Sequence, residues 1–223
     1  MKVLLATRNA HKLLEVRQIL ADGPARHLDV LGPDEAGIPP SPEEEHIEAF
    51  ESFEENAMAK ARWFGTRAGI PTLADDSGLE VDLLDGRPGV RSRRFAPLAP
   101  GEPEPEDQDR RNIDHLLDLL GDAPLAGRTG RFVCVAALWV PEHEVEVEGG
   151  REQMRRGEAA GLILGRPRGW EGFGYDPVFL DPPTGRTFAE MTAAEKRRRG
   201  HRGAAFRAIA PALATLNPVR GPS

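Results

Sequence analysis

The amino-acid sequence predicts an α/β fold with a mixed central β-sheet flanked by helices. Short apolar runs that suit buried strands alternate with longer segments of helical periodicity, which is the pattern of a sheet covered by helices. The stretch 128–164 instead suggests an antiparallel hairpin, so we expect the sheet to combine parallel and antiparallel strands. With 223 residues, the chain can bury a real hydrophobic core, as one domain or two closely joined lobes.

The first half of the chain begins with a strand, a turn and a helix. Apolar residues at helical spacing predict a long second helix, which the sequence Gly69-Ile70-Pro71 ends because proline cannot continue a helix. In order, we expect a strand at 2–6, a helix at 11–21, a short strand at 28–31, a helix at 47–68, and strands at 70–74 and 80–84.

The second half of the chain alternates in the same way. Four prolines and many acidic residues in 96–109 indicate an exposed loop, and the charged stretch 141–157 is typical of a hairpin tip that protrudes or frays. The elements expected here are a helix at 107–120, strands at 131–140 and 159–164, a glycine-rich loop at 165–174 and a single helix at 193–216.

Composition narrows the functional class. A formal net charge of -7 argues against a general nucleic-acid binder. The chain has no apolar run near the roughly 20 residues needed to cross a bilayer and no signal-peptide core, so we expect a soluble, cytoplasmic protein without a membrane partner. Its one cysteine, Cys134, lies in an apolar run, which excludes an intrachain disulfide and favours a buried structural thiol.

Two adjacent carboxylates, Asp75 and Asp76, follow the apolar run 70–74. Ser77-Gly78 would permit a tight bend there, at the strand end where ligands of α/β sheets bind. With a third carboxylate such as Glu48, the pair would form an oxygen-rich site of the kind that Mg²⁺ occupies together with phosphate oxygens. The alternative is an ordinary Asp-Ser-Gly turn with no ligand.

The turn between the first strand and the first helix suits an anion. It contains Thr7, Arg8, Asn9, Ala10, His11 and Lys12. Free backbone N–H groups and the positive end of the helix dipole meet there, and Lys12 adds a point charge, so the turn could hold a polyphosphate. Lysine is also uncommon in this chain, with four lysines against 25 arginines. The alternative is that Thr7 or Asn9 merely caps the helix, and the two interpretations are compatible.

The predicted helix at 47–68 could line the same cleft. Glu48, Asn56 and Lys60 are spaced by about two turns and one turn, which places them on one side of a helix. A solvated acidic face is the alternative for most of this segment, but Asn56 is a poor residue for the middle of a helix and suggests a specific role.

A glycine-rich loop with aromatic residues could hold a flat ligand. In the sequence 172–177, Phe173 lies between two glycines, and Tyr175 is the only tyrosine of the chain. A base could stack on Phe173 while polar groups contact its edge; the alternative is a strained turn that buries both rings in the core. Lys196, His201 and Arg202 add cationic groups near the last helix, whereas 197–199 suits a solvated face.

Together, the motifs resemble one family, the inosine triphosphate pyrophosphatases, also called non-canonical purine nucleoside triphosphate pyrophosphatases. The resemblance extends over nearly the whole chain. It rests on six ordered motifs: Thr7-Arg8-Asn9-x-x-Lys12, Glu48 with Glu55-Asn56-Ala57 and Lys60-Ala61, Ala74-Asp75-Asp76-Ser77-Gly78-Leu79, Gly89-Val90-x-Ser92-x-Arg94-Phe95-Ala96, Gly172-Phe173-Gly174-Tyr175-Asp176-Pro177, and Thr187-Phe188-Ala189-Glu190 through Glu195-Lys196 to His201-Arg202-Gly203.

The resemblance implies a fold, a reaction and partners. It implies a single domain over 1–223 whose two lobes enclose the active-site cleft, and Mg²⁺-dependent hydrolysis of ITP, dITP and XTP to the monophosphate and pyrophosphate. It also implies a homodimer that acts on a small nucleotide and binds neither nucleic acid nor membrane. A C6 keto oxygen would accept a hydrogen bond from Arg202 or its neighbours, whereas the amino group of adenine would meet a donor with a donor.

The resemblance also implies residue roles. Asp76 is the expected proton acceptor and a metal ligand, Glu48 the other metal ligand, and Asp75, Asn56 and Lys60 support them. The remaining expected substrate contacts are Thr7, Arg8, Asn9, Ala10, His11 and Lys12 on the triphosphate, Ser77, and Phe173, Gly174, Tyr175, Asp176, Lys196, His201 and Arg202 around the base.

The chain departs from the family pattern at a few positions. Gly200 replaces a usual serine before His201, Phe95 replaces a common tyrosine, and 141–157 is unusually charged.

Two rival functions remain open from the sequence. A Maf-type nucleotide pyrophosphatase would begin with a Ser-x-Ser-Pro-Arg loop, which 7–12 does not match, and a regulatory protein would bind the nucleotide without turnover.

Overall fold

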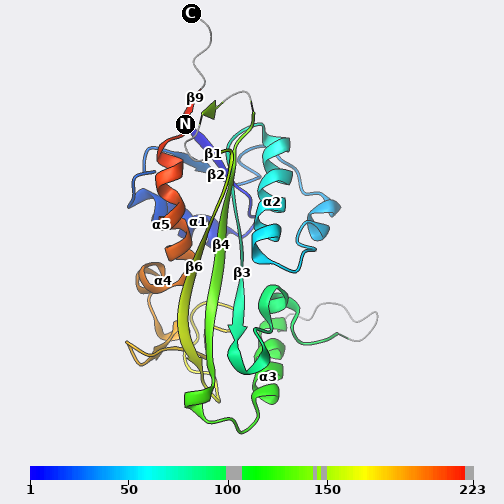
Figure 1. Ribbon diagram of the computed structural model, residues 1–223, viewed down its shortest axis with the longest axis vertical. Coiled ribbons are helices and arrows are strands. Elements are labelled where there is room, and N and C mark those ends of the chain that lie inside the picture. Colours follow the sequence, from blue (N-terminus) through cyan, green and yellow to red (C-terminus); the bar gives the residue numbers. More distant parts are fainter. Residues whose placement is uncertain (99–106, 143–144, 147–149, 219–223) are drawn as a thin grey trace, which may run out of the picture. The chain divides into compact units, whose positions relative to one another are not determined.

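The computed structural model describes residues 1–98, 107–142, 145–146 and 150–218. Within these residues, seven strands form one sheet in the order β2-β1-β3-β4-β6-β7-β8 (Figure 1). Strand β1 (Lys2–Leu5) pairs in parallel with β2 (Asp29–Leu31) and β3 (Thr72–Val81). The antiparallel pairs join β6 (Glu152–Ile163) to β7 (Phe179–Asp181), and β7 to β8 (Arg186–Thr187). The predicted mixed sheet is therefore confirmed.

The chain forms two compact units. Unit 1 comprises Met1–Asp76, Cys134–Gly157 and Arg202–Ser223, and unit 2 comprises Ser77–Val133 and Glu158–His201. The boundaries fall inside β3, inside β4 (Thr129–Trp139) and inside β6, so each of these strands contributes residues to both units. The single domain and the cleft between two lobes, which the resemblance implied, stay predictions.

In unit 1, helices cover the strands on both sides (Figure 1). Helices α1 (Ala10–Ala21) and α5 (His201–Ala214) bury their apolar faces against β1, β3 and β4, and α2 (Phe53–Ala68) lies on the opposite side of these strands. The most deeply buried side chains of the first face include Val3, Leu5, Val16, Leu73, Ala136, Leu138, Phe206, Ile209 and Leu213.

Unit 2 has its own core. Helix α3 (Gln108–Leu120) packs its apolar face against the strands of this unit, as its spacing predicts. The core side chains include Leu79, Val81, Ile113, Leu116, Phe132, Ile163, Val178, Phe179 and Phe188. The shorter elements of the chain are 3₁₀ turns at Pro42–His46, Asp82–Leu84, Gly89–Arg94, Leu125–Gly127 and Phe188–Glu190, and the pair β5 (Val145–Glu146) and β9 (Asn217–Pro218).

The predicted turn after Asp75-Asp76 is wrong. Strand β3 continues without interruption from Thr72 to Val81, so 72–74 and 80–81 of the two expected strands belong to one strand in which Ser77-Gly78 makes no bend. The rest of the expected strand at 80–84 is wrong, because Asp82–Leu84 forms a 3₁₀ turn. The long strand is stabilised by burial, since Leu79 and Val81 are core residues of unit 2 while Leu73 is a core residue of unit 1. The cores on both sides therefore outweigh the turn preference of Ser-Gly.

Two helix predictions also need correction. Helix α2 starts at Phe53, six residues later than expected, because the Ser52 side chain caps it by accepting a hydrogen bond from the Glu55 N–H. The expected helix at 193–216 is two helices, α4 (Ala193–Arg199) and α5. Gly200 separates them with an extended backbone, and a Cβ atom there would lie 2.6 Å from the Lys196 carbonyl oxygen.

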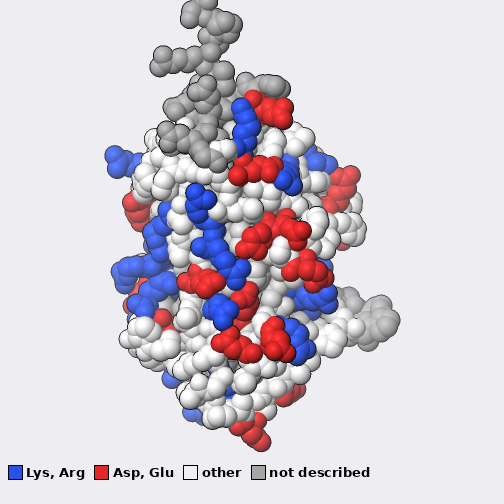
Figure 2. Space-filling model, in the orientation of Figure 1, with Lys and Arg blue, Asp and Glu red and all other residues white. Residues whose placement is uncertain are grey.

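Some expectations fall partly outside the described residues. These are the exposed loop at 96–109, of which 99–106 is not described, and the hairpin tip at 141–157, of which 143–144 and 147–149 are not described. The described part 152–157 of this expected tip is not a tip but the first half of β6, which begins at Glu152 and not at 159. Among the described helices, none is long and apolar enough to cross a bilayer. Figure 2 shows both Lys and Arg side chains and Asp and Glu side chains on the visible face.

A close contact between α2 and β4 in unit 1 generates a stability prediction. A Cβ atom on Gly65 would lie 2.3 Å from a ring carbon of Trp139. We expect Gly65→Ala to lower the free energy of unfolding by about 2 kcal/mol, because overpacking outweighs the better helix propensity of alanine. Urea unfolding measures the change. Gly127→Ala is the control, since a Cβ atom there meets no other atom within 4 Å; equal stability of Gly65→Ala and wild type would contradict the packing argument.

Candidate active site

Strand β3 directs its two adjacent carboxylates to opposite faces of the sheet. Successive side chains alternate across a strand, so Asp75 follows Leu73 toward α1 and α5, whereas Asp76 points toward α2. The contacts agree with this alternation, since Asp75 bonds to residues of α1 and α5 and Asp76 bonds to Asn56 of α2. The two carboxylates therefore have separate environments.

Asp75 lies in a buried cluster of cations. Its side chain is 1% exposed, and its Oδ2 atom lies 3.3 Å from Lys12 Nζ and 3.3 Å from Arg202 Nε. Burial alone would raise the pKa of Asp75, but the positive charges of Lys12, Arg202 and Lys60 outweigh it and hold the pKa well below its usual value. Asp75 is therefore a permanent anion that keeps these cations in place.

Arg202 completes this cluster from α5. Its Nη1 atom donates to Glu15 Oε2 at 2.9 Å, so the guanidinium group bridges the carboxylates of Asp75 and Glu15. Burial opposes the charge of Arg202, yet Asp75 and Glu15 raise its pKa above the usual value. The thiol of Cys134 lies 4.0 Å from Asp75 Oδ2, and burial raises the pKa of this thiol, which supports the prediction of a structural cysteine.

Asp76 has the opposite electrostatic character. It accepts a hydrogen bond from Asn56 Nδ2 at 3.0 Å. Burial and the negative charge of Glu48 raise the pKa of Asp76 to about 6, although Lys60 and the Asn56 bond act in the other direction. A carboxylate with such a pKa can accept a proton near neutral pH.

Asn56 joins Asp76 to the segment that precedes α2. Besides its bond to Asp76, the Asn56 amide accepts from the Phe50 N–H at 2.9 Å and donates to the Phe50 carbonyl at 3.2 Å. This segment includes Glu48, whose carboxylate forms an ion pair with Lys60. Burial opposes the charge of Lys60, but Glu48 and Asp75 outweigh it and raise the Lys60 pKa. The sequence thus predicted a specific role for Asn56, although Glu48 lies before the helix and not on it.

The donor chemistry around Asp76 fits a hard divalent cation. Glu48 is close enough to Asp76 for its negative charge to raise the Asp76 pKa. A bound cation would relieve this repulsion. Among the described residues, no three His, Cys, Asp or Glu side chains form a closed metal cage. Two carboxylates suit Mg²⁺, which keeps several waters and substrate oxygens in its coordination shell.

The loop before α1 caps the helix, as one of the two interpretations predicted. Asn9 Oδ1 accepts from the backbone N–H groups of His11 at 2.9 Å and Lys12 at 3.1 Å, and Thr7 Oγ1 accepts from Asn9 N–H. Ala10 and His11 are exposed. The Lys12 ammonium group lies on Asp75, so the cap positions a cation beside the carboxylate pair.

Arg8 has a different environment from the one expected. Its guanidinium group forms ion pairs with Glu44 at 2.7 Å and with Asp34 at 2.5 Å, and it also donates to the Ile38 carbonyl. These bonds fix the segment around Glu44 to the loop before α1. A contact between Arg8 and a phosphate stays a prediction.

The two aromatic rings of the loop at 172–177, in unit 2, differ in burial. Tyr175 is buried in the core and its hydroxyl donates to the Ser92 carbonyl at 2.9 Å, whereas Phe173 is 50% exposed. The alternative of a ring tucked into the core therefore holds for Tyr175 alone. Asp176 accepts from Phe173 N–H at 3.2 Å and from Lys196 Nζ at 2.5 Å, and Lys196 Nζ lies 5.7 Å from the centre of the Phe173 ring.

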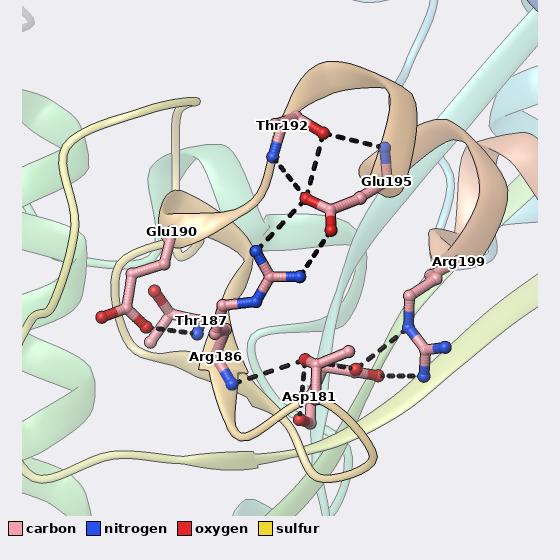
Figure 3. Close-up of polar contacts among 8 residues, drawn as sticks. Asp181, Arg186, Thr187, Glu190, Thr192, Glu195 and Arg199 are labelled. Atoms are coloured by element: carbon pink, nitrogen blue, oxygen red, sulfur yellow. Dashed lines mark hydrogen bonds and ion pairs between the residues drawn. The ribbon is translucent and has the colours of Figure 1, made fainter.

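Ion pairs hold both ends of α4, the helix that carries Lys196 (Figure 3). Arg186 of β8 donates to both oxygens of Glu195, at 2.5 and 3.3 Å. Arg199 donates to both oxygens of Asp181 at 3.0 Å. Thr192 caps the helix and bonds to Glu195 in the same network, so the residue next to Lys196 is held by three groups.

The structure groups the predicted site residues by unit. Lys12, Glu48, Asn56, Lys60, Asp75, Asp76 and Arg202 lie together in unit 1, whereas Phe173, Gly174, Tyr175, Asp176, Lys196 and His201 belong to unit 2, in which Ser77 is the first residue. The His201 ring stacks on Phe132 with centroids 4.8 Å apart. Arg202 faces Asp75 and Glu15 in unit 1, so its contact with a base stays a prediction.

Sequence reasoning missed Glu15, and a signal for it existed. Glu15 lies three residues after Lys12, which places both on one face of α1. Both residues contact the buried cluster, one through Arg202 and the other through Asp75. The periodicity of the first helix could therefore have suggested this carboxylate.

Comparisons with known proteins agree on one family. The model of the Ham1 family matches residues 3–212. The chain is 45% identical over 213 residues to a dITP/XTP pyrophosphatase of Frankia alni, which covers 96% of this chain and 97% of the relative. It is 43% identical over 215 residues to a protein of the same name from Nocardia farcinica, with 96% of both chains covered.

Solved structures agree with this similarity. A HAM1 protein from Coxiella burnetii matches with a TM-score of 0.77 and 33% identity, over 96% of this chain and 98% of the other. A structure described as a nucleoside-triphosphatase / dITP/XTP pyrophosphatase from Mycobacterium abscessus matches with a TM-score of 0.65 and 35% identity, over 89% of this chain and 92% of the other.

The ion pair of Glu195 generates a prediction of pH-dependent stability. The hydrogen bonds from Arg186 and from Thr192 lower the pKa of Glu195 from 4.5 to about 2. Since the folded-state pKa is the lower one, ionised Glu195 stabilises the fold above pH 4.5, and this contribution is lost as the pH falls from 4.5 toward 2. We therefore expect Glu195→Gln to lower the free energy of unfolding at pH 7, with a smaller difference from wild type at lower pH.

Urea unfolding of both proteins at several pH values between 7 and the acid transition measures this difference. Glu171→Gln, a change at an exposed glutamate of the same unit, is the control. A difference between wild type and Glu195→Gln that is constant with pH would show that the ion pair contributes nothing to stability.

Proposed function

The chain belongs to the Ham1 family, and from this we propose that it is a nucleoside triphosphate pyrophosphatase that hydrolyses dITP, XTP and ITP to the monophosphate and pyrophosphate. The proposal is supported by relatives named dITP/XTP pyrophosphatase that align over nearly their full length. Hydrolysis of these deaminated purine nucleotides would remove them from the nucleotide pool. Because that pool is cytoplasmic, we expect the enzyme to act there.

The observation that carries the chemistry is the contrast between Asp75 and Asp76. Asp76 is half-buried, has a pKa of about 6 and lies beside Glu48 and Lys60. In the proposed reaction, Asp76 accepts the proton of a water molecule that attacks the α-phosphorus, and pyrophosphate leaves. Before a cation binds, Asp76 is ionised at neutral pH yet basic enough to take a proton, which suits this step.

We propose that Glu48 and Asp76 hold Mg²⁺, as the donor chemistry of the site supports. When bound, the ion would neutralise charge on the triphosphate and supply a Lewis acid. The residues of the chain have separate tasks. Lys12 and Lys60 contribute positive charge on either side of the carboxylate pair, Asp75 keeps the cations in position, and Asn56 holds Asp76 and the segment of Glu48 together.

The half-exposed ring of Phe173 supports the recognition of a purine ring. A base could stack on this ring while Lys196, 5.7 Å from the ring centre, contacts its edge. A hydrogen-bond donor of the protein opposite C6 of the base would bond to a keto oxygen but not to the amino group of adenine. This difference can support strong discrimination between keto purines and adenine. The remaining predicted contacts, from Thr7, Asn9, Ala10, His11, Ser77, Gly174, Asp176, His201 and Arg202, are part of the same proposal.

A substrate panel tests the proposed function. Pyrophosphate release is measured with dITP, XTP, ITP, GTP and ATP, with Mg²⁺ and with excess EDTA. We expect release from the first three nucleotides at least about a hundred-fold faster in kcat/KM than from ATP, because an unpaired buried polar group costs this much. EDTA should abolish the release, and added Mg²⁺ should restore it.

The outcomes separate the rival functions. Preferred release from another class of nucleotide would favour a Maf-type activity, and tight binding of ITP without release would favour a regulatory protein. No Mg²⁺-dependent release from any of the three nucleotides would contradict the proposal. The proposed homodimer is tested on the same preparation by light scattering after size exclusion, where a mass near 24.4 kDa would contradict it.

A further inference from the structure

The tip of the Phe173 loop depends on two glycines and on two carboxylates. Gly172 and Gly174 adopt φ angles of +88° and +58°, which glycine tolerates best, and the turn between them leaves Phe173 half exposed. The Phe173 N–H donates to Asp176 within the loop. The Gly174 N–H donates to Asp109 Oδ2 at 2.7 Å, a distance typical of a strong charge-assisted bond.

Asp109 comes from a distant part of the chain. It is the second residue of α3 and lies 65 residues before Gly174 in the sequence, but both belong to unit 2. The bond is therefore a tertiary contact that joins the first turn of α3 to the tip of the aromatic loop. None of the motifs that identified the family includes Asp109.

The first turns of α3 are themselves well fixed. Asn112 is buried, and its side chain accepts from the Ala96 N–H at 2.8 Å and donates to the carbonyl groups of Arg93 and Ser92. The same Ser92 carbonyl accepts from the hydroxyl of Tyr175, the residue after Gly174. The helix turn that carries Asp109 is thus held by several hydrogen bonds. Tyr175, the residue after Gly174, is bonded to the same Ser92 carbonyl as Asn112 of this helix.

We propose that Asp109 is a positioning residue that holds the Gly174 backbone, so that Phe173 presents its ring face to the purine base. The proposal rests on the function proposed above and deepens it. Asp109 itself touches neither base nor phosphate in this account, and it acts on substrate binding through the loop. A substitution of Asp109 should therefore change KM and leave kcat unaltered, because the proposed reacting groups are Asp76 and the residues around it.

A different role for Asp109 makes a different prediction. An acidic residue in the first turn of a helix also stabilises that helix by its interaction with the helix dipole. Asn at this position would lose the charge but keep an oxygen that can accept from Gly174 N–H. Asp109→Asn and Asp109→Ala therefore distinguish loop positioning from helix stabilisation.

The experiment compares these two variants with Asp114→Ala, an exposed change one turn further along α3 whose side chain pairs with Arg110. We expect Asp109→Ala to raise KM for XTP and ITP about ten-fold with unchanged kcat, the loss expected for one charge-assisted hydrogen bond. Asp109→Asn should remain closer to wild type, and Asp114→Ala should match wild type.

Hydrogen exchange provides a readout that needs no turnover. We expect peptides that cover 172–176 to exchange faster in Asp109→Ala than in wild type, with little change in Asp109→Asn or Asp114→Ala. Unaltered exchange in Asp109→Ala, or equal KM changes in the Asn and Ala variants, would overturn the positioning role. Failure of the wild-type enzyme to hydrolyse the nucleotides would instead contradict the proposed function, and the exchange measurement would still test the contact.

Discussion

The alternation of side chains along β3 is the constraint on which the candidate site depends. Because Asp75 and Asp76 are neighbours on one continuous strand, their carboxylates point to opposite faces, one toward α1 and α5 and the other toward α2. The strand thus gives two identical side chains two different chemical characters, with a lowered pKa for Asp75 and a raised pKa for Asp76.

The surrounding helices carry the residues that give the two carboxylates these different environments. The capped first turn of α1 places Lys12 on Asp75, and the first turn of α5 places Arg202 there. A buried carboxylate is costly unless its charge is compensated, so the cation cluster and Asp75 depend on each other. On the other face, Asn56 fixes Asp76 while the charge of Glu48 is only partly offset by Lys60. The remaining negative charge on the α2 face fits the divalent cation and the proton transfer of the proposed reaction better than the cation-rich α1 face does.

The sequence predicts the fold class and most of the elements because burial and periodicity are local patterns. Its errors occur where tertiary contacts decide. Ser77-Gly78 has turn chemistry, but the cores of both units keep the strand extended. Gly200 interrupts a helical pattern that continues in the composition on either side of it. The motifs singled out Asp76, Glu48 and Asn56. Helix spacing could have suggested Glu15 beside Lys12, but the contacts of Glu15 with Arg202 and of Asp109 with Gly174 span 187 and 65 residues of chain, which spacing alone does not reveal.

The most direct test of the divided pair is to compare Asp75→Asn with Asp76→Asn in the same two assays, urea unfolding and pyrophosphate release from XTP with Mg²⁺. Removal of the Asp75 charge takes one of two carboxylates from the buried Arg202 and the contacting carboxylate from Lys12, so we expect Asp75→Asn to lose about 3 kcal/mol of unfolding free energy. Asp76→Asn should have an unfolding free energy at least as large as that of wild type, because it removes a carboxylate whose ionisation the fold disfavours. It should nevertheless release no pyrophosphate. If the two variants were equally destabilised, or if Asp76→Asn kept its activity, the account would be wrong.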